Sequence, residues 1–439
     1  MKINPVKVNN EKRVLGFWTS TSLVVGNMIG SGIFLLPSAL AIYGGISIFG
    51  WMLTTLGAIL LSLVFVNLSH EFPKIGGPYF YARKGFGDFS GFIVAYGYWI
   101  SILCGNAAIS VALVSYLAMF IPALSEQPIF GAIAALANLW ILTFINSVGI
   151  RFSGRVQFIT TVLKILPLIA IAFFGIFYFE ANHFIPLNIS SETPFKAITA
   201  TATLTLWAFL GLESATIPAD NIKDPKRTIP RATITGTLIS AFVYIFATVS
   251  VMGIISPTDL SVSNAPFADA AAQVWGSAAG YVVAAAGVVA CFGALNGWIL
   301  LQGQIPLAAS IDNLFPKRFA NLSKAGTPVF GLVLSSVLIS IIMMMNFTKG
   351  LVEKFTFVIL LATLATLVPY LFSTLAQLKF IFLSSNNKKS IKLLIVTVIA
   401  CLYSVWAVIG LGMYTIIWGV IFISTGIPIY IWMRSRRMK

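Results

Sequence analysis

The amino-acid sequence predicts an all-α integral membrane protein, and three observations lead to this fold class. The chain has 439 residues, of which 58% are hydrophobic and only 9% are charged, and its mean hydropathy is +0.93. Soluble domains carry about 25% charged residues, so a water-soluble fold of this length would not bury so much apolar surface. Apolar runs long enough to cross about 30 Å of hydrocarbon recur along the chain, without the short alternating segments of an outer-membrane barrel.

Twelve membrane spans are expected, in a single transmembrane domain that covers residues 1–439. Their approximate limits are 16–44, 46–70, 90–122, 128–149, 156–179, 195–220, 231–255, 268–303, 328–347, 353–377, 392–411 and 414–433. The first, third, sixth and eighth are longer than a straight crossing needs, so these spans must tilt, kink or break. The loops between the spans are too short to fold as separate domains.

Positive charge orients the predicted bundle. The chain has 28 basic and 13 acidic residues, a net charge of +15, which raises nucleic acid as a candidate partner. The basic residues lie in short loops and at the termini, however, and nearly all fall on one side when both termini are placed inside; the exceptions are Lys164, Lys196, Lys349 and Lys354. Cytoplasmic loops carry such an excess. We therefore expect a multi-pass inner-membrane protein with cytoplasmic termini and no nucleic-acid partner.

Two connecting segments are singled out by their composition. "NIKDPKRTIPR", 221–231, is expected to be a basic loop that acts either as a cytoplasmic tether or as a gate. "LAASIDNLFPKRFANLSK", 307–324, is mildly amphipathic and is expected to form a short interfacial helix on the cytoplasmic face. The three cysteines have unrelated spacings and form no metal or disulfide pattern, so neither a metal nor a cofactor is expected.

The first span contains an unusual cluster of small residues, "GNMIGSGIF", from Gly26 to Phe34. Gly26 and Gly30 match the small-xxx-small pattern that lets two membrane helices pack closely. Two glycines on either side of Ser31 also disfavour a continuous helix. The cluster therefore serves close packing, a helix break, or both.

The sixth span has a counterpart to this cluster at Gly211, in "TLWAFLGLESA". Spans one and six begin two groups of five, 16–179 and 195–377, which correspond under an inverted repeat, and two further helices follow at 392–433. Interrupted spans at corresponding positions of two halves indicate a transporter binding site. Half-helix N-termini offer N–H groups to a carboxylate, and unwound carbonyls suit an ammonium group. An α-amino acid carries both groups.

Two ionisable residues, Glu213 and Lys164, are expected at mid-membrane depth within the predicted spans, where an unpaired charge is costly and therefore indicates function. Glu213 in span six is either a carboxylate that reaches the cytoplasmic surface or a carboxyl that binds a proton in one state and releases it in another. Lys164 in span five, one turn before Pro167, either reaches the surface, donates to carbonyls of a broken helix, or titrates. Trp298 in span eight lies beside Asn296 and Gly297, where it could stack on a cationic group.

The stretches "GNMIGSGIFLLP", "LTLWAFLGLESA" and "DPKRTIPRAT" together resemble the amino acid–polyamine–organocation superfamily. More closely, they are similar to bacterial basic amino acid/polyamine antiporters, which exchange arginine for agmatine or ornithine for putrescine. The resemblance covers roughly 16–434. It implies a LeuT-like fold of ten helices in an inverted five-plus-five repeat with broken helices one and six, plus two C-terminal helices. It also implies amino acid or polyamine substrates, protons as coupling partners and a homodimer in the lipid bilayer.

The resemblance also implies roles for individual residues. Backbone amides at Ser31 and Gly32 would hold the substrate carboxylate, and carbonyls near Met28, Trp207 and Leu210 would take its α-amino group. Trp207 would stack on the substrate, and Trp298 would close the distal side. The remaining implied substrate contacts are Asn27 and Asn106, and the implied gate and proton-coupling residues are Tyr98, Glu213, Tyr370 and Lys164.

Four positions depart from the arginine/agmatine pattern and leave the identity of the substrate side chain open. Ile102 and Ile109 replace softer or more polar positions, Ala362 replaces a serine, and Lys164 replaces a small apolar residue. Lys164 resembles instead the span-five lysine of branches that carry neutral amino acids or couple to protons. The sequence thus predicts an antiporter that exchanges arginine or ornithine for agmatine or putrescine. The alternative is a neutral or broad-specificity exchanger or a proton-coupled symporter. A channel or a membrane enzyme is disfavoured, because neither a symmetric pore motif nor a nucleophile–base set is present.

Overall fold

The computed structural model describes residues 14–263, 265–345, 351–383 and 391–437. The helices of the first part are α1 (Phe17–Met28), α2 (Ser31–Ala41), α3 (Ser47–Glu71), α4 (Pro78–Phe86), α5 (Asp88–Leu117), α6 (Ala123–Glu126), α7 (Pro128–Val148) and α8 (Ile150–Phe174). Those of the second part are α9 (Pro194–Phe209), α10 (Pro225–Ile254), α11 (Pro257–Val262), α12 (Pro266–Trp275), α13 (Ser277–Ile311), α14 (Val329–Met345) and α15 (Leu351–Leu383). Three helices end the chain: α16 (Ile391–Gly410), α17 (Met413–Ser424) and α18 (Gly426–Arg437).

The predicted all-α membrane fold is confirmed. Eleven helical stretches of the described chain are long and apolar enough to cross a membrane, and Val329–Met344 is a shorter apolar helix at the place of the ninth predicted span. Within the described residues, the only extended pairing is an isolated bridge between Leu15 and Ile222. The count of twelve crossings and the inverted symmetry of the two halves stay predictions.

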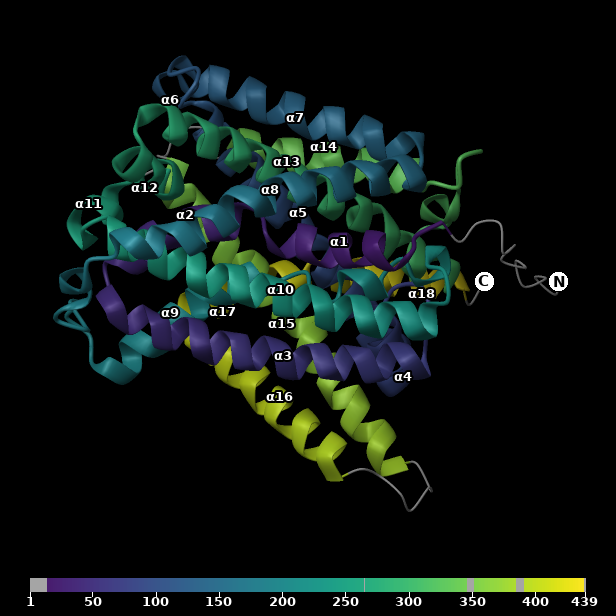
Figure 1. Cartoon of the computed structure of the whole chain (residues 1–439). Coiled ribbons are helices and arrows are strands. Elements are labelled where there is room, and N and C mark those ends of the chain that lie inside the picture. Colours follow the sequence, from purple (N-terminus) through teal and green to yellow (C-terminus); the bar gives the residue numbers. More distant parts are fainter. Residues whose placement is uncertain (1–13, 264, 346–350, 384–390, 438–439) are drawn as a thin grey trace.

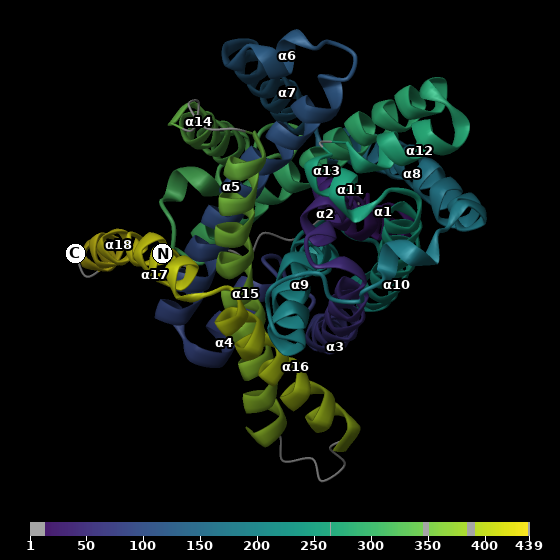
Figure 2. The same ribbon diagram turned by 90° about the vertical axis from the view of Figure 1, so that its left-hand side faces the viewer.

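The long helices run between two ends of the bundle (Figure 1). One end, which we call the α4 end, holds α4 and the first turn of α1; the opposite end holds α6, α11 and α12. Seen from that opposite end, α2 and α9 lie near the middle and α16 protrudes from the body (Figure 2). The most apolar window of the α1–α2 stretch is 88% buried, whereas that of the last span is only 11% buried. Broken helices therefore occupy the core, and the C-terminal helices lie at the periphery.

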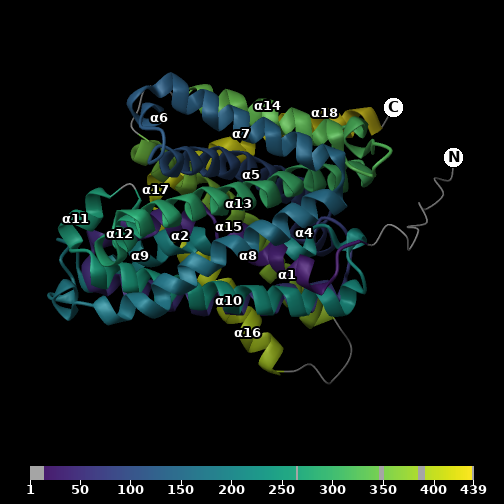
Figure 3. The same ribbon diagram turned by 45° about the horizontal axis from the view of Figure 1, so that its top comes forward.

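Small and hydroxyl-bearing residues hold the helices together, as is usual where lipid cannot drive helix association. Ser62 of α3 shares a hydrogen bond of 2.8 Å with Thr237 of α10, and Thr143 of α7 one of 2.7 Å with Ser336 of α14. Helices α7 and α14 lie side by side along one edge of the bundle (Figure 3). Large apolar side chains such as Phe144 face outward instead, which suits a lipid-facing surface.

Three sequence-based boundaries were wrong. Residues 225–231 form the first turns of α10 and not a loop, because Pro225 is well placed at a helix start. The expected interfacial helix at 307–324 is absent: α13 extends to Ile311, and only a 3₁₀ turn, Lys317–Ala320, follows it. The predicted eighth span is divided at Gly276, whose φ of +86° separates α12 from α13.

A polar cluster ties α4 to the end of α13. Arg83 Nη1 lies 2.6 Å from Asp312 Oδ2, and its Nε lies 2.8 Å from Asp88 Oδ1. The Tyr79 hydroxyl donates to Asp312 Oδ2 at 2.8 Å. Burial, and then the neighbouring Asp312 carboxylate, raises the pKa of the Tyr79 hydroxyl well above its usual range, so this group stays a hydrogen-bond donor. These contacts join the segment between α3 and α5 to the cytoplasm-facing end expected for α13.

A substitution at Gly50 tests the close packing of α3 against α9. A methyl group at Gly50 would lie 2.8 Å from the backbone nitrogen of Ala202, so one helix would have to move. We expect Gly50→Ala to destabilise the protein by about 1–3 kcal/mol, the usual cost of overpacking. Thermal unfolding of the detergent-solubilised protein measures this effect, and Gly16→Ala is the control, because nothing lies near that position. Equal melting temperatures for the two variants would contradict the packing.

Candidate functional site

The first break lies between α1 and α2. Helix α1 ends at Met28, Ile29 is extended (φ −76°, ψ 91°), and α2 begins at Ser31. A Cβ at Gly30 would lie 2.6 Å from Ala294 of α13, and one at Gly26 would overlap the Gln157 side chain of α8. Both readings of the glycine cluster therefore hold, because Gly26 and Gly30 serve close packing while the chain opens at Ile29 and Gly30.

The second break follows α9, which ends at Phe209. Leu210 is extended, with φ −65° and ψ 134°, and Gly211 has φ +108°, a conformation that favours glycine. A short 3₁₀ turn, Ser214–Thr216, continues the chain. The Tyr244 hydroxyl of α10 donates to the Ala208 carbonyl at 2.7 Å and so holds the open end of α9.

The two breaks face each other. Asn27 Nδ2 donates to Ser214 Oγ at 2.8 Å, and a Cβ at Gly211 would lie 3.0 Å from Asn27 Cβ. Trp298 of α13 spans both breaks: its Nε1 donates to the Asn27 carbonyl at 3.1 Å, and its Cζ2 lies 3.3 Å from the Cβ position of Gly211. Segments far apart in the sequence thus form one site, as the resemblance implied.

Glu213 is fully buried beside the second break. The hydroxyls of Tyr98, from α5, and Tyr370, from α15, both donate to its carboxylate, and the Gly211 N–H donates to its Oε2 at 3.2 Å. These donors are neutral, and none of the ion pairs within the described residues includes Glu213. The side chain therefore does not reach the membrane surface, and a cation could still approach the carboxylate as its counter-charge.

Lys164 is also fully buried, at the first break. Its Nζ donates to the Gly26 carbonyl at 2.7 Å and to the Ile29 carbonyl. Both carbonyls belong to the C-terminal end of α1, where the helix dipole favours a positive charge. Of the three alternatives for Lys164, the structure shows donation to the carbonyls of a broken helix, and the side chain does not extend to the surface.

Of the aromatic and amide residues predicted to contact substrate, Trp207 lies at a break, whereas Asn106 has its hydrogen bond to another helix. Trp207, at the end of α9, lies 3.1 Å from the Cβ position of Gly32 at the start of α2. Asn106 bonds to α13: its Nδ2 donates to Gln302 Oε1 at 2.7 Å, and no hydrogen bond joins it to either break within the described residues. Its buried Oδ1 is an acceptor without a partner there.

A small apolar wall borders Trp207. Cys104, Leu361 and Ala362 are buried together, and the Trp207 ring packs against them. The Ser101 hydroxyl donates to the Ala362 carbonyl at 2.8 Å, which leaves that carbonyl already occupied. The departure from the expected serine at position 362 therefore lies next to the aromatic residue to which the resemblance gives substrate stacking.

The structure adds residues that the sequence did not single out. Ser214 and Tyr244 each hold one break, and neither carries a sequence signal, because hydroxyl groups are common within these spans. Gln157 of α8 accepts from Asn296 Nδ2 at 3.2 Å, and Asn296 is in turn bonded to Asn146 of α7. A lone amide within an apolar span is a usable signal, since it must find a partner in the bundle.

Comparisons with known proteins identify relatives of this chain. A family model described as amino acid permease matches residues 15–434. The cadaverine/lysine antiporter of Escherichia coli strain K12 is 36% identical over 405 residues, which cover 90% of this chain and 89% of the relative. The putrescine transporter PotE of the same strain is 32% identical over 418 residues, 95% of each chain, and that of Haemophilus influenzae is 32% identical over 419 residues, 95% of this chain and 96% of the relative. These relatives are transporters and not enzymes.

Removing the Lys164 ammonium tests its contact with α1. In Lys164→Met, the Gly26 and Ile29 carbonyls lose a buried donor, which costs about 1–3 kcal/mol for each polar group left unsatisfied. We expect a lower melting temperature in detergent and slower transport. Lys196→Met is the matched control, because Lys196 is exposed and has only the exposed Glu192 at 3.6 Å. If both variants melt like the unmodified protein, Lys164 does not hold the break.

Proposed function

We propose, since this chain belongs to the amino acid permease family, that it is an inner-membrane antiporter that exchanges a basic amino acid for the amine left by its decarboxylation. The observation that carries the proposal is the Glu213 carboxylate, which is fully buried and bonded only to neutral donors. A carboxylate in such a place is stabilised by a positive charge that arrives from outside, and both substrates carry one.

The two breaks supply complementary groups for a substrate backbone. The first N–H groups of α2, at Ser31 and Gly32, have no partner within that helix and suit a carboxylate. Carbonyls at the ends of α1 and α9, near Met28, Trp207 and Leu210, suit an ammonium. An amine that lacks the carboxylate would use only the carbonyl side. One site can therefore take both substrates in turn, as an exchanger requires.

The wall beside Trp207 bears on the substrate side chain. Cys104, Leu361 and Ala362 offer apolar surface to a methylene chain. A guanidinium group presents five donors and needs several acceptors, whereas an ammonium needs at most three. The resemblance of the sequence implied arginine or ornithine as the amino acid substrate. Lysine is added as a candidate because one relative is named a cadaverine/lysine antiporter. The wall favours ornithine or lysine, exchanged for putrescine or cadaverine, over arginine and agmatine.

Alternating access is the proposed mechanism. Trp207 and Trp298 close over the substrate from opposite sides, and the Glu213 cluster with Tyr98 and Tyr370 forms the gate toward the α4 end. The excess of basic residues in the loops at that end supports a cytoplasmic orientation for it. Because Tyr98 and Tyr370 come from α5 and α15, loss of their bonds to Glu213 would free these two helices from the second break.

A second candidate function is favoured by Lys164. Its ammonium already occupies two carbonyls of the first break, which is the place where a coupling ion would act. Release of a proton there would loosen α1. This contact suits a neutral or broad-specificity exchanger or a proton-coupled symporter.

Counterflow in proteoliposomes distinguishes the two candidates. Vesicles are loaded with unlabelled lysine, ornithine, arginine or leucine, and uptake of the labelled amine or amino acid is followed with and without a proton gradient. We expect uptake that requires an internal basic amino acid or its amine and that needs no gradient. Uptake driven by leucine or by the gradient alone would instead support the second candidate.

Glu213→Gln tests the gate carboxyl. Glutamine keeps the size of the side chain but never carries the negative charge, so the pH dependence of exchange should flatten. The apparent affinity for a diamine should fall by about tenfold, as expected for the loss of a hydrogen-bonded charge. Glu126→Gln, an exposed acid of α6, is the control. An unchanged pH profile in Glu213→Gln would remove the proposed role.

A further inference from the structure

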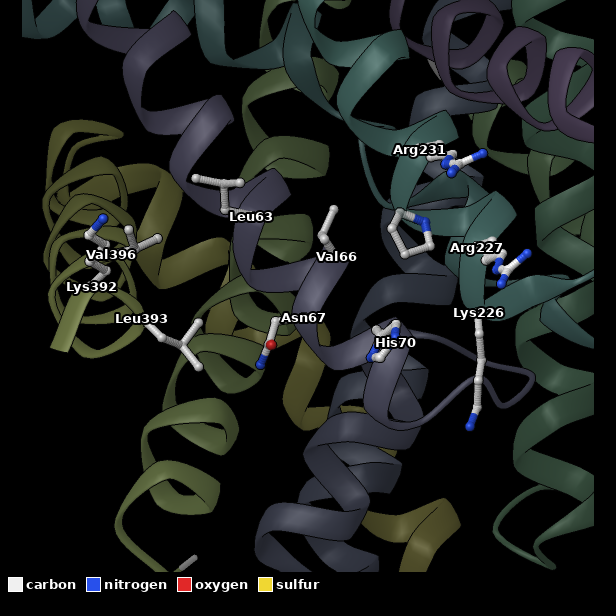
Figure 4. Close-up of a pocket in the computed structure, with 11 residues that line it drawn as sticks. Leu63, Val66, Asn67, His70, Lys226, Arg227, Arg231, Lys392, Leu393 and Val396 are labelled. Carbon is white, nitrogen blue, oxygen red and sulfur yellow. The ribbon is translucent and has the colours of Figure 1, made fainter. Parts of the chain in front are cut away.

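A groove with a volume of about 510 Å³ crosses the outer side of α3 near the α4 end, between α10 and α16 (Figure 4). Helix α3 contributes Leu63, Val66, Asn67 and His70, which share one helix face. Helix α10 lines one side with Lys226, Arg227, Pro230 and Arg231, and α16 lines the other with Lys392, Leu393 and Val396. This groove lies outside the substrate site, and the proposed exchange does not use it.

The groove exists because α3 and α16 diverge. At Gly57, α3 touches the Tyr403 ring of α16, where an added methyl group would overlap the ring. Toward the α4 end the two helices separate, and α16 leaves the body of the bundle (Figure 1). Helix α10 stays with α3, because Ser62 and Thr237 are hydrogen-bonded at 2.8 Å. The opening is therefore built between a fixed helix pair and a peripheral helix.

The lining residues of α3 and of α16 both change from apolar, deeper in the span, to polar or charged at the α4 end of the groove. On α3, Leu63 and Val66 lie deeper in the span, and His70 lies at its end. On α16, Lys392 lies in the first turn, and Leu393 and Val396 follow it inward. This gradient matches a lipid molecule, whose charged head lies at the interface and whose acyl chains lie in the hydrocarbon.

The charge of the groove is of one sign. Its lining includes three basic residues of α10 and one of α16 but no acidic residue. Arg227 has the exposed Asp224 at 3.8 Å, whereas Arg231 and Lys392 have no ion-pair partner within the described residues. Lys226, Arg227 and Arg231 stand on one side of the α3 residues, and Lys392 stands on the other (Figure 4). The start of α10 adds the positive end of a helix dipole.

The groove is continuous with surface that faces lipid. On α10, Leu238, Phe242 and Phe246 are exposed at four-residue steps, and on α16 Ile395, Ile399 and Leu402 are exposed. A ligand with acyl chains can therefore enter sideways from the bilayer, which a soluble anion would not do. We propose that this groove binds an anionic phospholipid, with its charged headgroup at the basic side chains of the lining and its acyl chains along α10 and α16.

Binding of phosphatidylglycerol to the full-length protein in detergent, measured by native mass spectrometry, tests this site. The test variant is Arg231→Gln with Lys392→Gln, and the control is Arg155→Gln with Lys317→Gln, which removes the same charge from exposed positions outside the groove. Each basic residue beside an anionic lipid contributes roughly a fivefold change in binding, so we expect the test variant to bind about 30-fold more weakly. The control should bind like the unmodified protein.

Three results would overturn the proposal. Equal losses in the two double variants would mean that only the general positive charge matters. Equal binding of phosphatidylcholine and phosphatidylglycerol would mean that the groove does not distinguish lipids by the charge of their headgroups. Displacement of the lipid by inorganic phosphate alone would assign the groove to a soluble anion. If the test variant does not fold, the proposal is tested by hydrogen exchange of the unmodified protein in nanodiscs. Nanodiscs of phosphatidylglycerol must then slow the exchange of backbone amides in the first turns of α16 relative to nanodiscs of phosphatidylcholine. Equal exchange in the two lipids would overturn the proposal.

Discussion

The structure depends on how backbone groups are satisfied where two helices break inside a membrane. Hydrocarbon offers no water to an open N–H or carbonyl group, so a break is tolerated only where other parts of the protein supply partners. Here Lys164 donates to the Gly26 and Ile29 carbonyls, and Trp298 donates to that of Asn27. Tyr244 donates to the Ala208 carbonyl at the second break. Each donor comes from an unbroken helix, so α8, α10 and α13 hold the breaks in place.

The two buried ionisable groups, Lys164 and Glu213, differ in the kind of partner that surrounds them. Lys164 faces the backbone of α1, where its charge is already compensated by carbonyl dipoles. Glu213 faces neutral hydroxyls, and its charge has no such compensation within the described residues. A cationic substrate therefore changes the energy of Glu213 much more than that of Lys164. The proposed coupling between substrate and gate follows from this difference, because the hydroxyls that bond Glu213 belong to α5 and α15.

Hydropathy and glycine clusters predicted the spans and the positions of both breaks, because each depends on local composition. The partners of Glu213 came only from the resemblance, since Tyr98 and Tyr370 lie far from it in sequence. For Lys164 the sequence left donation to the carbonyls of a broken helix as one of three alternatives, because only the packing of α8 against α1 decides among them. Boundaries failed where a proline permitted a helix to begin early, as at Pro225, or where α13 continued beyond the apolar run. The substrate contact assigned to Asn106 stays a prediction, and the bond of its amide group to Gln302 of α13 is a packing contact that the sequence does not indicate.

The groove and the substrate site share helices but differ in what they hold. Helix α3 supports α9 through the Thr54 hydroxyl, which donates to the Ala202 carbonyl at 2.9 Å, and α10 supports it through Tyr244. These contacts lie in the middle of the bundle, where α3 and α10 are bonded to each other through Ser62 and Thr237. An anion at the groove contacts the start of α10 and the first turn of α16, at one end of the bundle and away from this joined middle. A lipid there would consequently stabilise the peripheral helix while it leaves the geometry of the two breaks unchanged.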